Sequence, residues 1–383
     1  MKQRLEQNGT SAPASEYDVI IVGAGAAGLG CGVTLRHFGI ENFLILERHD
    51  VGASFDRWPA EMRFITPSFT SNQFGTLDLN AVALGTSPAF SLGREHPSGA
   101  EFAAYLRAYA AHFELPIQTG VDVLTVQPLG AGGFRLLTSA GEFQSRFVIW
   151  AIGEFQYPRL DPFPGAELCR HNAQVASWRE VQGDDLLIIG GYESGADAAI
   201  HLTLLGKRVR VLDKKGRWDD NDSDPSVTLS PFTRERLQAA RAKQRIELIG
   251  PAKVVRVQKT WRGYVVQGAE GEKWKTATPP ILATGFRGGA RRIAKLFEWK
   301  RGHVALTEQD EATVTPGLFL VGPQVRHDKV IFCFIYKFRQ RFAIVARAIA
   351  ERLGLDCDGI VETYRKAGMF LDDLSCCTEE CVC

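Results

Sequence analysis

Four cysteines lie within the last eight residues of the chain: Cys376, Cys377, Cys381 and Cys383, in the sequence CCTEECVC. Thiols so close together could exchange electrons with a disulfide, or they could hold a soft metal ion such as Cu(I) or Zn(II). Cys377 and Cys381 are spaced for an unstrained loop disulfide, whereas the adjacent pair would form a strained ring that is easily reduced. We favour redox exchange over metal capture because a nucleotide-binding pattern lies upstream.

That pattern is a glycine-rich turn near the N-terminus. Residues 17–48 read as a buried strand, the turn GAGAAG, a helix, and a second buried strand that ends in an acid. Gly23 permits the tight turn, Gly25 lets backbone approach a pyrophosphate, and Gly28 brings the helix close to the strand. The phosphates would lie at the helix N-terminus, where free N–H groups favour anions. Glu47, 19 residues after Gly28, is placed to accept hydrogen bonds from an adenosine ribose.

The same pattern occurs a second time with one important substitution. Residues 186–213 read as a strand, the turn GGYESG, a helix, and a strand that ends in Asp213. Tyr192 stands where the second glycine should be. Its ring should obstruct an NADPH in the usual pose and could instead stack on a flavin or an adenine, unless it tilts outward and NADPH binds anyway. Lys214, together with Lys215 and Arg217, could neutralise a 2′-phosphate or simply face water.

Size and composition restrict the classes of function that the chain can have. The chain has 383 residues, a formal net charge of +1 and 45% hydrophobic residues, which suits two domains and gives no sign of a nucleic-acid partner. The longest apolar runs, such as Val330 to Tyr336, are far too short to span a bilayer. Met1 to Ser15 lacks the apolar core of a signal peptide, so we expect a disordered leader over residues 1–16 and a cytoplasmic protein without a membrane partner.

These motifs together resemble the two-dinucleotide-domain flavoprotein superfamily, whose branches include thioredoxin reductases and flavin-containing monooxygenases. The resemblance covers about residues 17–355 and also depends on the turns 151–153 and 283–285 and on residues 318–322. It implies an α/β fold with two Rossmann-like domains (three-layer ββα). The implied division is a discontinuous FAD domain over 17–157 and 280–367, a second dinucleotide domain over 158–279, and a cysteine-rich tail over 368–383.

The resemblance also implies which residues contact the cofactors. The loop near Gly322 should lie along the flavin, although Gly322-Pro323 replaces the common Gly-Asp and one hydrogen bond to the ribityl chain would be missing. His327 is our choice for acid–base work near the flavin, although a solvated basic loop is an equally open interpretation. The residues expected at the two pockets are Gly23, Gly25, Ala26, Ala27, Glu47, Arg48, Ser54, Trp58, Val123, Ala151, Gly153, Gly191, Tyr192, Glu193, Ser194, Asp213, Lys214, Thr284, Gly285, Gly322, Pro323 and Lys329.

Residues 52–69 point to one branch of this superfamily, because their sequence, GASFDRWPAEMRFITPSF, resembles that of bacilliredoxin-reductase-like proteins. Those proteins carry a cysteine in the first glycine turn, where this chain has Ala26 and Ala27, and no CxxC occurs anywhere. The combination suggests the diflavin-linked disulfide oxidoreductases, in which a second FAD occupies the pocket normally used by NADPH. The resemblance therefore implies one or two FAD per chain, a thiol or disulfide substrate, and a homodimer. The four cysteines of the tail would be the catalytic thiols.

Two other functions stay open. An NADPH-dependent flavin monooxygenase should show the pattern FxGxxxH, but Cys169 stands at the histidine position and His171 comes two residues late. A flavoprotein whose tail captures a soft metal is the third alternative. Cys333, in the apolar run IFCFIY, follows the flavin-proximal loop and has a modest claim to a redox role, although a buried cysteine is commonly just a small hydrophobe.

Overall fold

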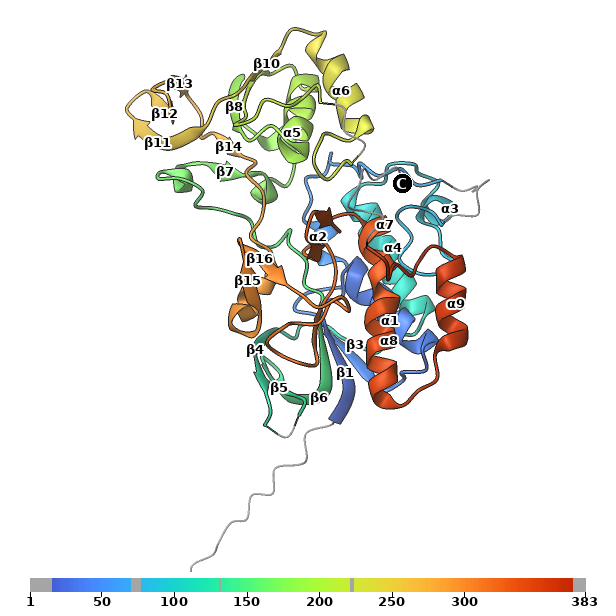
Figure 1. The fold of residues 1–383 in the computed structure, drawn as a ribbon. Coiled ribbons are helices and arrows are strands. Elements are labelled where there is room, and N and C mark those ends of the chain that lie inside the picture. The colour runs from blue at the N-terminus through green and yellow to red at the C-terminus, as the bar shows by residue number, and fades with distance from the viewer. Residues whose placement is uncertain (1–15, 70–76, 131, 221–223, 375–383) are drawn as a thin grey trace, which may run out of the picture.

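The computed structural model describes residues 16–69, 77–130, 132–220 and 224–374. The expected leader and the four cysteines of the tail lie outside these residues. The described chain forms two α/β units, each built on a parallel sheet, with the second unit above the first in Figure 1. Within the described residues, no helix has the length and apolar character needed to cross a membrane.

The first unit holds the larger sheet, in the order β3-β2-β1-β6-β5-β4, with β17 pairing with β6 on a branch from that path. The β1–β2, β2–β3, β1–β6 and β6–β17 pairs are parallel, while β4, β5 and β6 form an antiparallel meander. The strands are β1 (Glu16–Val22), β2 (Phe43–Leu46), β3 (Ile117–Gln118), β4 (Val123–Pro128), β5 (Phe134–Thr138), β6 (Gly141–Trp150) and β17 (Leu318–Leu320). Because β17 comes from far along the sequence, this unit is discontinuous.

Helices cover the first sheet and share its core (Figure 1). Helix α1 packs so closely on α8 that a Cβ at Gly30 would lie 2.3 Å from the Phe342 ring. Helix α8 buries Phe342, Val345 and Ile349, and it ends at Gly354 with a φ of 77°. The helices are α1 (Ala26–His37), α2 (Ala53–Asp56), α3 (Pro88–Leu92), α4 (Gly99–His112), α7 (Ile335–Phe338), α8 (Phe342–Leu353) and α9 (Asp358–Lys366).

The second unit has the sheet order β10-β9-β8-β14-β7, covered by α5 (Glu193–Leu204) and α6 (Pro231–Arg241). Strand β14 pairs with both β7 and β8. The expected domain boundary at residue 280 is therefore wrong, because it assigns β14 to the FAD domain. The strands are β7 (Arg170–His171), β8 (Asp185–Ile189), β9 (Arg208–Leu212), β10 (Ile246–Ile249), β14 (Ile281–Leu282), and a separate antiparallel sheet of β11 (Val254–Thr260), β12 (Gly263–Gly268) and β13 (Lys273–Thr276).

Small elements complete the fold. Two antiparallel hairpins lie between β14 and α7 in the sequence, and short 3₁₀ turns connect the larger elements. They are β15 (Glu298–Lys300), β16 (His303–Ala305), β18 (Arg326–His327), β19 (Val330–Ile331), η1 (Ala166–Leu168), η2 (Asn172–Gln174), η3 (Trp178–Glu180), η4 (Gly289–Leu296) and η5 (Arg339–Arg341).

A buried network of charged side chains joins the β18–β19 hairpin, through Asp310, to η5 directly before α8. Asp310 is fully buried and accepts hydrogen bonds from Nε and Nη2 of Arg341, both at 3.0 Å. His327 Nε2 lies 2.6 Å from Asp310 Oδ1. His327 does not line either of the two cavities described below. The network thus gives this histidine a structural role and weakens our choice of it for acid–base work.

Replacing Asp310 by asparagine should destabilise the fold strongly. The change leaves the buried guanidinium of Arg341 without its ionic partner, which typically costs about 3–5 kcal/mol. Urea unfolding would measure the loss. Asp161→Asn is the matched control, because Asp161 pairs with Arg287 at the surface and exposed pairs contribute about 1 kcal/mol or less. Equal losses in the two variants would contradict the role given to the network.

Candidate functional site

The first glycine turn connects β1 to α1 with the geometry that the motif requires. The Gly23 N–H donates to the Leu46 carbonyl at 2.8 Å, which joins the turn to the end of β2. Glu47 follows β2, is only 8% exposed, and accepts from the Ala24 N–H and the His49 N–H, both at 2.8 Å. The carboxylate at the ribose position is therefore held rigidly by backbone on both oxygens.

The three glycines of this turn have three different surroundings. Gly23 has a φ of 109°, and a Cβ there would lie 2.7 Å from the Ala151 carbonyl oxygen. A Cβ at Gly28 would lie 1.9 Å from the Gly23 carbonyl oxygen, so helix and strand touch at this point. By contrast, a Cβ at Gly25 would meet nothing within 4 Å. Open space therefore lies at the N-terminus of α1, where the pyrophosphate is expected.

A cavity of about 370 Å³ begins at this turn and extends to the first turn of α5 in the second unit. Most of the residues predicted for the two cofactor pockets line it, Glu193 and Ser194 of the second glycine turn included. They are Gly23, Gly25, Ala26, Ala27, Glu47, Arg48, Ser54, Trp58, Val123, Ala151, Gly153, Glu193, Ser194 and Pro323. The lining residues thus come from segments distant in sequence, as a discontinuous cofactor site requires.

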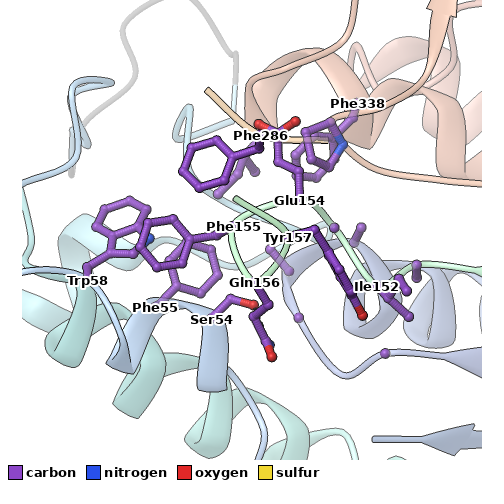
Figure 2. Close-up of a pocket in the computed structure, with 18 of the residues that line it drawn as sticks. Ser54, Phe55, Trp58, Ile152, Glu154, Phe155, Gln156, Tyr157, Phe286 and Phe338 are labelled. Atoms are coloured by element: carbon purple, nitrogen blue, oxygen red, sulfur yellow. Dashed lines mark hydrogen bonds between the residues drawn. The ribbon is translucent and has the colours of Figure 1, made fainter. Parts of the chain in front are cut away.

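Aromatic rings form one wall of the cavity. Figure 2 shows Phe55, Trp58 and Phe155 gathered on one side, with ring centroids 5.2 Å apart for Phe55 and Trp58 and 6.2 Å apart for Trp58 and Phe155. Gln156, on the loop after β6, donates to Ser54 Oγ at 2.9 Å and accepts from Arg48 Nη2 at 2.8 Å. An aromatic, apolar wall beside a hydrogen-bonding edge suits an isoalloxazine ring.

Glu154 is a residue of this cavity that our sequence analysis missed. It follows the turn 151–153 and lies close to Phe286 and Phe338 in Figure 2. Burial raises the pKa of its carboxyl group to about 7. A carboxyl group that titrates near neutral pH can hold or release a proton beside the expected flavin.

The titration of Glu154 should be visible in the stability of the flavin-free protein. Its folded pKa, about 7, lies above the ordinary value of 4.5, so the folded state binds more protons between these values. Its contribution is complete below about pH 4.5 and is lost as the pH rises to about 7, a loss of roughly 3 kcal/mol. Urea unfolding across this range should show that loss in the native chain and not in Glu154→Gln; parallel pH profiles would contradict the assignment.

The second glycine turn repeats the first in its backbone. Gly190 has a φ of 104°, and a Cβ at Gly195 would lie 1.9 Å from the Gly190 carbonyl oxygen. The Gly191 N–H donates to Asp213 Oδ2 at 3.0 Å, as Ala24 does to Glu47. Tyr192 is the N-cap of α5, with φ −84° and ψ −166°, as Gly25 is the N-cap of α1. The Rossmann-like turn is therefore intact, and only the side chains differ.

Those side chains occupy the N-terminus of α5. Tyr192 Oη lies 2.5 Å from the Pro225 carbonyl oxygen and 2.9 Å from that of Thr228, so the ring is fixed by the 225–228 loop. The carboxyl group of Glu193 accepts from the Ser230 N–H at 2.5 Å and lies 2.6 Å from Thr233 Oγ1. The side chains of Tyr192 and Glu193 are therefore both held in position by the segment 225–233.

Several predicted residues lie outside the first cavity. Gly191 is covered by Trp218, whose Nε1 donates to its carbonyl at 2.9 Å. Gly285 accepts from the His171 ring, and Thr284 Oγ1 is buried without a hydrogen-bond partner. A Cβ at Gly322 would lie 3.2 Å from the Ala27 side chain, so its loop runs beside α1. The residues that do not line this cavity are Gly191, Tyr192, Asp213, Lys214, Thr284, Gly285, Gly322 and Lys329.

Cys333 is the described cysteine that reaches the cavity. It lies just before α7, and its thiol donates to Ser226 Oγ at 3.2 Å. Lys337 donates to the same Ser226 Oγ at 2.9 Å and to Asp224 at 2.6 Å. Burial raises the pKa of the Cys333 thiol, so little reactive thiolate forms at neutral pH.

A family model described as pyridine nucleotide-disulphide oxidoreductase matches residues 20–322. The chain belongs to this family. The oxidoreductase class and the two-domain α/β fold predicted from the sequence are thus confirmed. The match includes both glycine turns and the connection between them.

Individual relatives agree with this assignment. The uncharacterized oxidoreductase CzcO of Bacillus velezensis is 32% identical over 197 residues, 49% of this chain and 52% of the relative. The match therefore spans about half the length of that protein. Bacilliredoxin reductase Bdr of Bacillus subtilis is 23% identical over 337 residues, 87% of this chain and 97% of that protein.

Solved structures share the fold along most of the chain. Bacillithiol disulfide reductase Bdr (YpdA) of Staphylococcus aureus matches 88% of this chain and 99% of its own with a TM-score of 0.71 and 20% identity. A flavin-containing monooxygenase of Stenotrophomonas maltophilia covers the same shares with a TM-score of 0.69 and 19% identity. The fold is therefore common to disulfide reductases and monooxygenases, and the choice between them depends on the site.

Proposed function

We propose that this protein is an FAD-dependent disulfide oxidoreductase that exchanges electrons between one flavin and a thiol or disulfide. The observation that carries the proposal is the cavity that runs from the first glycine turn to Glu154 and Cys333. Its open space at Gly25 and its fixed Glu47 suit the pyrophosphate and ribose of FAD, and its aromatic wall suits the flavin. Similarity along nearly the whole chain to bacilliredoxin reductase Bdr supports the thiol chemistry.

We further propose that the terminal cysteines carry electrons between the flavin and the substrate. The four described cysteines are free thiols, and burial raises the pKa of each one. Disulfide exchange needs a thiolate, so these four are poor candidates for rapid exchange. Cys376, Cys377, Cys381 and Cys383 are the alternative within the same chain. A homodimer and a cytoplasmic location stay predictions.

The second unit is proposed to hold no dinucleotide in the usual pose. NADPH and FAD both carry a pyrophosphate, and the N-terminus of α5 presents Tyr192 and the carboxyl group of Glu193 to it. We therefore expect one FAD per chain instead of the two that the resemblance to diflavin enzymes suggested. Counting flavins released per chain on denaturation tests this directly, and two flavins per chain would overturn it.

NADPH should reduce the bound flavin slowly for the same reason. The double variant Tyr192→Gly and Glu193→Gln removes the ring and the acidic group, and it should speed the reduction by roughly tenfold or more, since charge-assisted phosphate contacts are strong. Stopped-flow reduction under argon measures the rates. Tyr192→Phe is the control, because it keeps the ring while losing only the hydroxyl. Rapid bleaching of the native flavin by NADPH would contradict this prediction.

A monooxygenase receives less support from the site. His171, the nearest match to the histidine of the FxGxxxH pattern, is fully buried. Its Nδ1 accepts from the Ala173 N–H at 3.1 Å, and its Nε2 lies 3.2 Å from the Gly285 carbonyl oxygen. This histidine is therefore engaged with backbone and does not line the cavity. Oxygen consumption driven by NADPH without any thiol would favour the monooxygenase.

A further inference from the structure

A second cavity of about 670 Å³ adjoins the first and shares Glu154, Phe286, Pro323 and Cys333 with it. We call it the arginine cleft, because five arginines from four separate segments line it: Arg159, Arg287, Arg291, Arg301 and Arg326. Glu154 is the one acidic side chain among the described residues of its lining. The cleft therefore joins a strongly basic surface to the wall of the flavin cavity.

Most of this positive charge has no carboxylate beside it. Arg287 pairs with Asp161 at the surface. Arg291 lies over the ring of Trp299, 4.7 Å from its centroid, and Arg326 donates to the Asp328 carbonyl at 2.9 Å. The described residues offer no salt bridge to Arg159, Arg291, Arg301 or Arg326.

The positive charge of Arg326 also affects a neighbouring histidine, His303. His303 lines the cleft, and its Nε2 lies 3.2 Å from Arg326 Nη1. Burial and then the positive charge of Arg326 lower the pKa of this histidine. It is therefore neutral at physiological pH, and the arginines supply the charge of the cleft.

Like charges gathered in a hollow repel one another and attract anions, because the low-dielectric walls focus the field. A guanidinium group binds carboxylate and phosphate through paired hydrogen bonds, which makes arginine the residue best suited to such ligands. A volume of about 670 Å³ lies within the range of small-molecule sites. At the second glycine turn, the side chains of Tyr192 and Glu193 are fixed by hydrogen bonds to Pro225 and Ser230.

We propose that the arginine cleft binds a small molecule bearing carboxylate or phosphate groups and holds it beside Glu154 and Cys333. This ligand would meet the flavin cavity from the side of the cleft instead of from the second nucleotide turn. The inference rests on the proposed function only in assigning a flavin to the adjoining cavity. The binding itself follows from the charge and shape of the cleft.

Titration calorimetry on the flavin-loaded full chain tests the proposal, with citrate and inorganic pyrophosphate as the probes. The tighter of the two distinguishes a carboxylate ligand from a phosphate ligand. The double variant Arg291→Gln and Arg301→Gln should weaken the tighter probe by about tenfold or more, since hydrogen bonds between two ionised groups are stronger than neutral ones. Quenching of Trp299 fluorescence, absent in Trp299→Phe, gives a second readout inside the cleft.

Arg262→Gln is the matched control. Arg262 is also exposed and lies over a tryptophan ring, 4.0 Å from the centroid of Trp261, but it belongs to the β11–β12 turn. This variant should bind both probes as the native chain does. Failure of the native chain to bind either probe, or equal weakening in the control, would overturn the proposal.

The cysteine-rich tail also carries Glu379 and Glu380, so it is the alternative occupant of the cleft. If the chain ending at Ser375 bound the probes about tenfold or more tightly than the full chain, the tail would be shown to fill the cleft and the small-molecule proposal would fall. Unchanged affinity supports it. None of these measurements needs turnover, so loss of thiol activity and loss of anion binding can be told apart.

Discussion

The variant Gly25→Val is expected to fold as the native chain does and to lose most of its affinity for FAD. A Cβ at this position would meet nothing of the protein within 4 Å, and the backbone, with φ −87° and ψ −173°, is extended and accepts a β-branched residue. The same space is where the pyrophosphate must approach the N–H groups of α1. Each charge-assisted hydrogen bond lost there costs about 1.5–3 kcal/mol, so affinity should fall roughly 100-fold or more.

Fluorescence titration of the flavin-free protein with FAD measures this effect, and thermal unfolding checks that the fold survives. Gly359→Val is the matched control, because a Cβ there also meets nothing within 4 Å but lies on α9, away from the cavity. Gly28→Val should instead fail to fold, since its Cβ would lie 1.9 Å from a carbonyl oxygen. Native FAD affinity in Gly25→Val would place the cofactor elsewhere.

A chain ending at Ser375 is expected to keep its FAD but to lose thiol/disulfide turnover by roughly 100-fold or more, because the described thiols form little thiolate. Burial raises the pKa of Cys169 to about 12 and that of Cys31 well above its usual value. Cys333 is nearest the flavin cavity, and burial raises the pKa of its thiol as well.

Steady-state reduction of a disulfide, with flavin content measured on the same sample, checks this prediction. Cys169→Ser and Cys357→Ser are controls that remove a thiol outside the cavity, and both should retain native turnover. If Cys333→Ser lost turnover while the shortened chain kept it, the exchanging thiol would be Cys333 and the role proposed for the tail would be wrong.

The parts of the site that the sequence predicted are those encoded locally. The strand, glycine turn, helix and acid of residues 17–48 are consecutive, so their geometry follows from residue types alone. The position of the Tyr192 side chain could not be predicted in this way, because its hydroxyl donates hydrogen bonds to carbonyl groups 33 and 36 residues away. Glu193 likewise depends on Ser230 and Thr233, which no local pattern marks.

That Glu154 and Cys333 line the same cavity could not be predicted locally for a related reason. They lie in segments 179 residues apart and meet only because β17 pairs with β6 and leads the chain back to the first unit. The one available signal for Glu154 was an acid directly after the small-residue turn 151–153. The domain boundary expected at residue 280 was wrong for the same reason. Strand β14 has only two residues, and only its pairing with neighbours such as β8 shows which sheet it belongs to.

In the proposed function, the flavin of this protein exchanges electrons with thiols. The most direct test mixes the flavin-loaded full chain with an excess of a dithiol under argon and follows the absorbance of oxidised flavin. Because thiol–disulfide exchange is reversible, the result does not depend on the physiological direction. We predict rapid bleaching in the full chain and little in the chain ending at Ser375. A flavin that stays oxidised with the dithiol in the full chain, yet bleaches rapidly with NADPH, would contradict the proposed function.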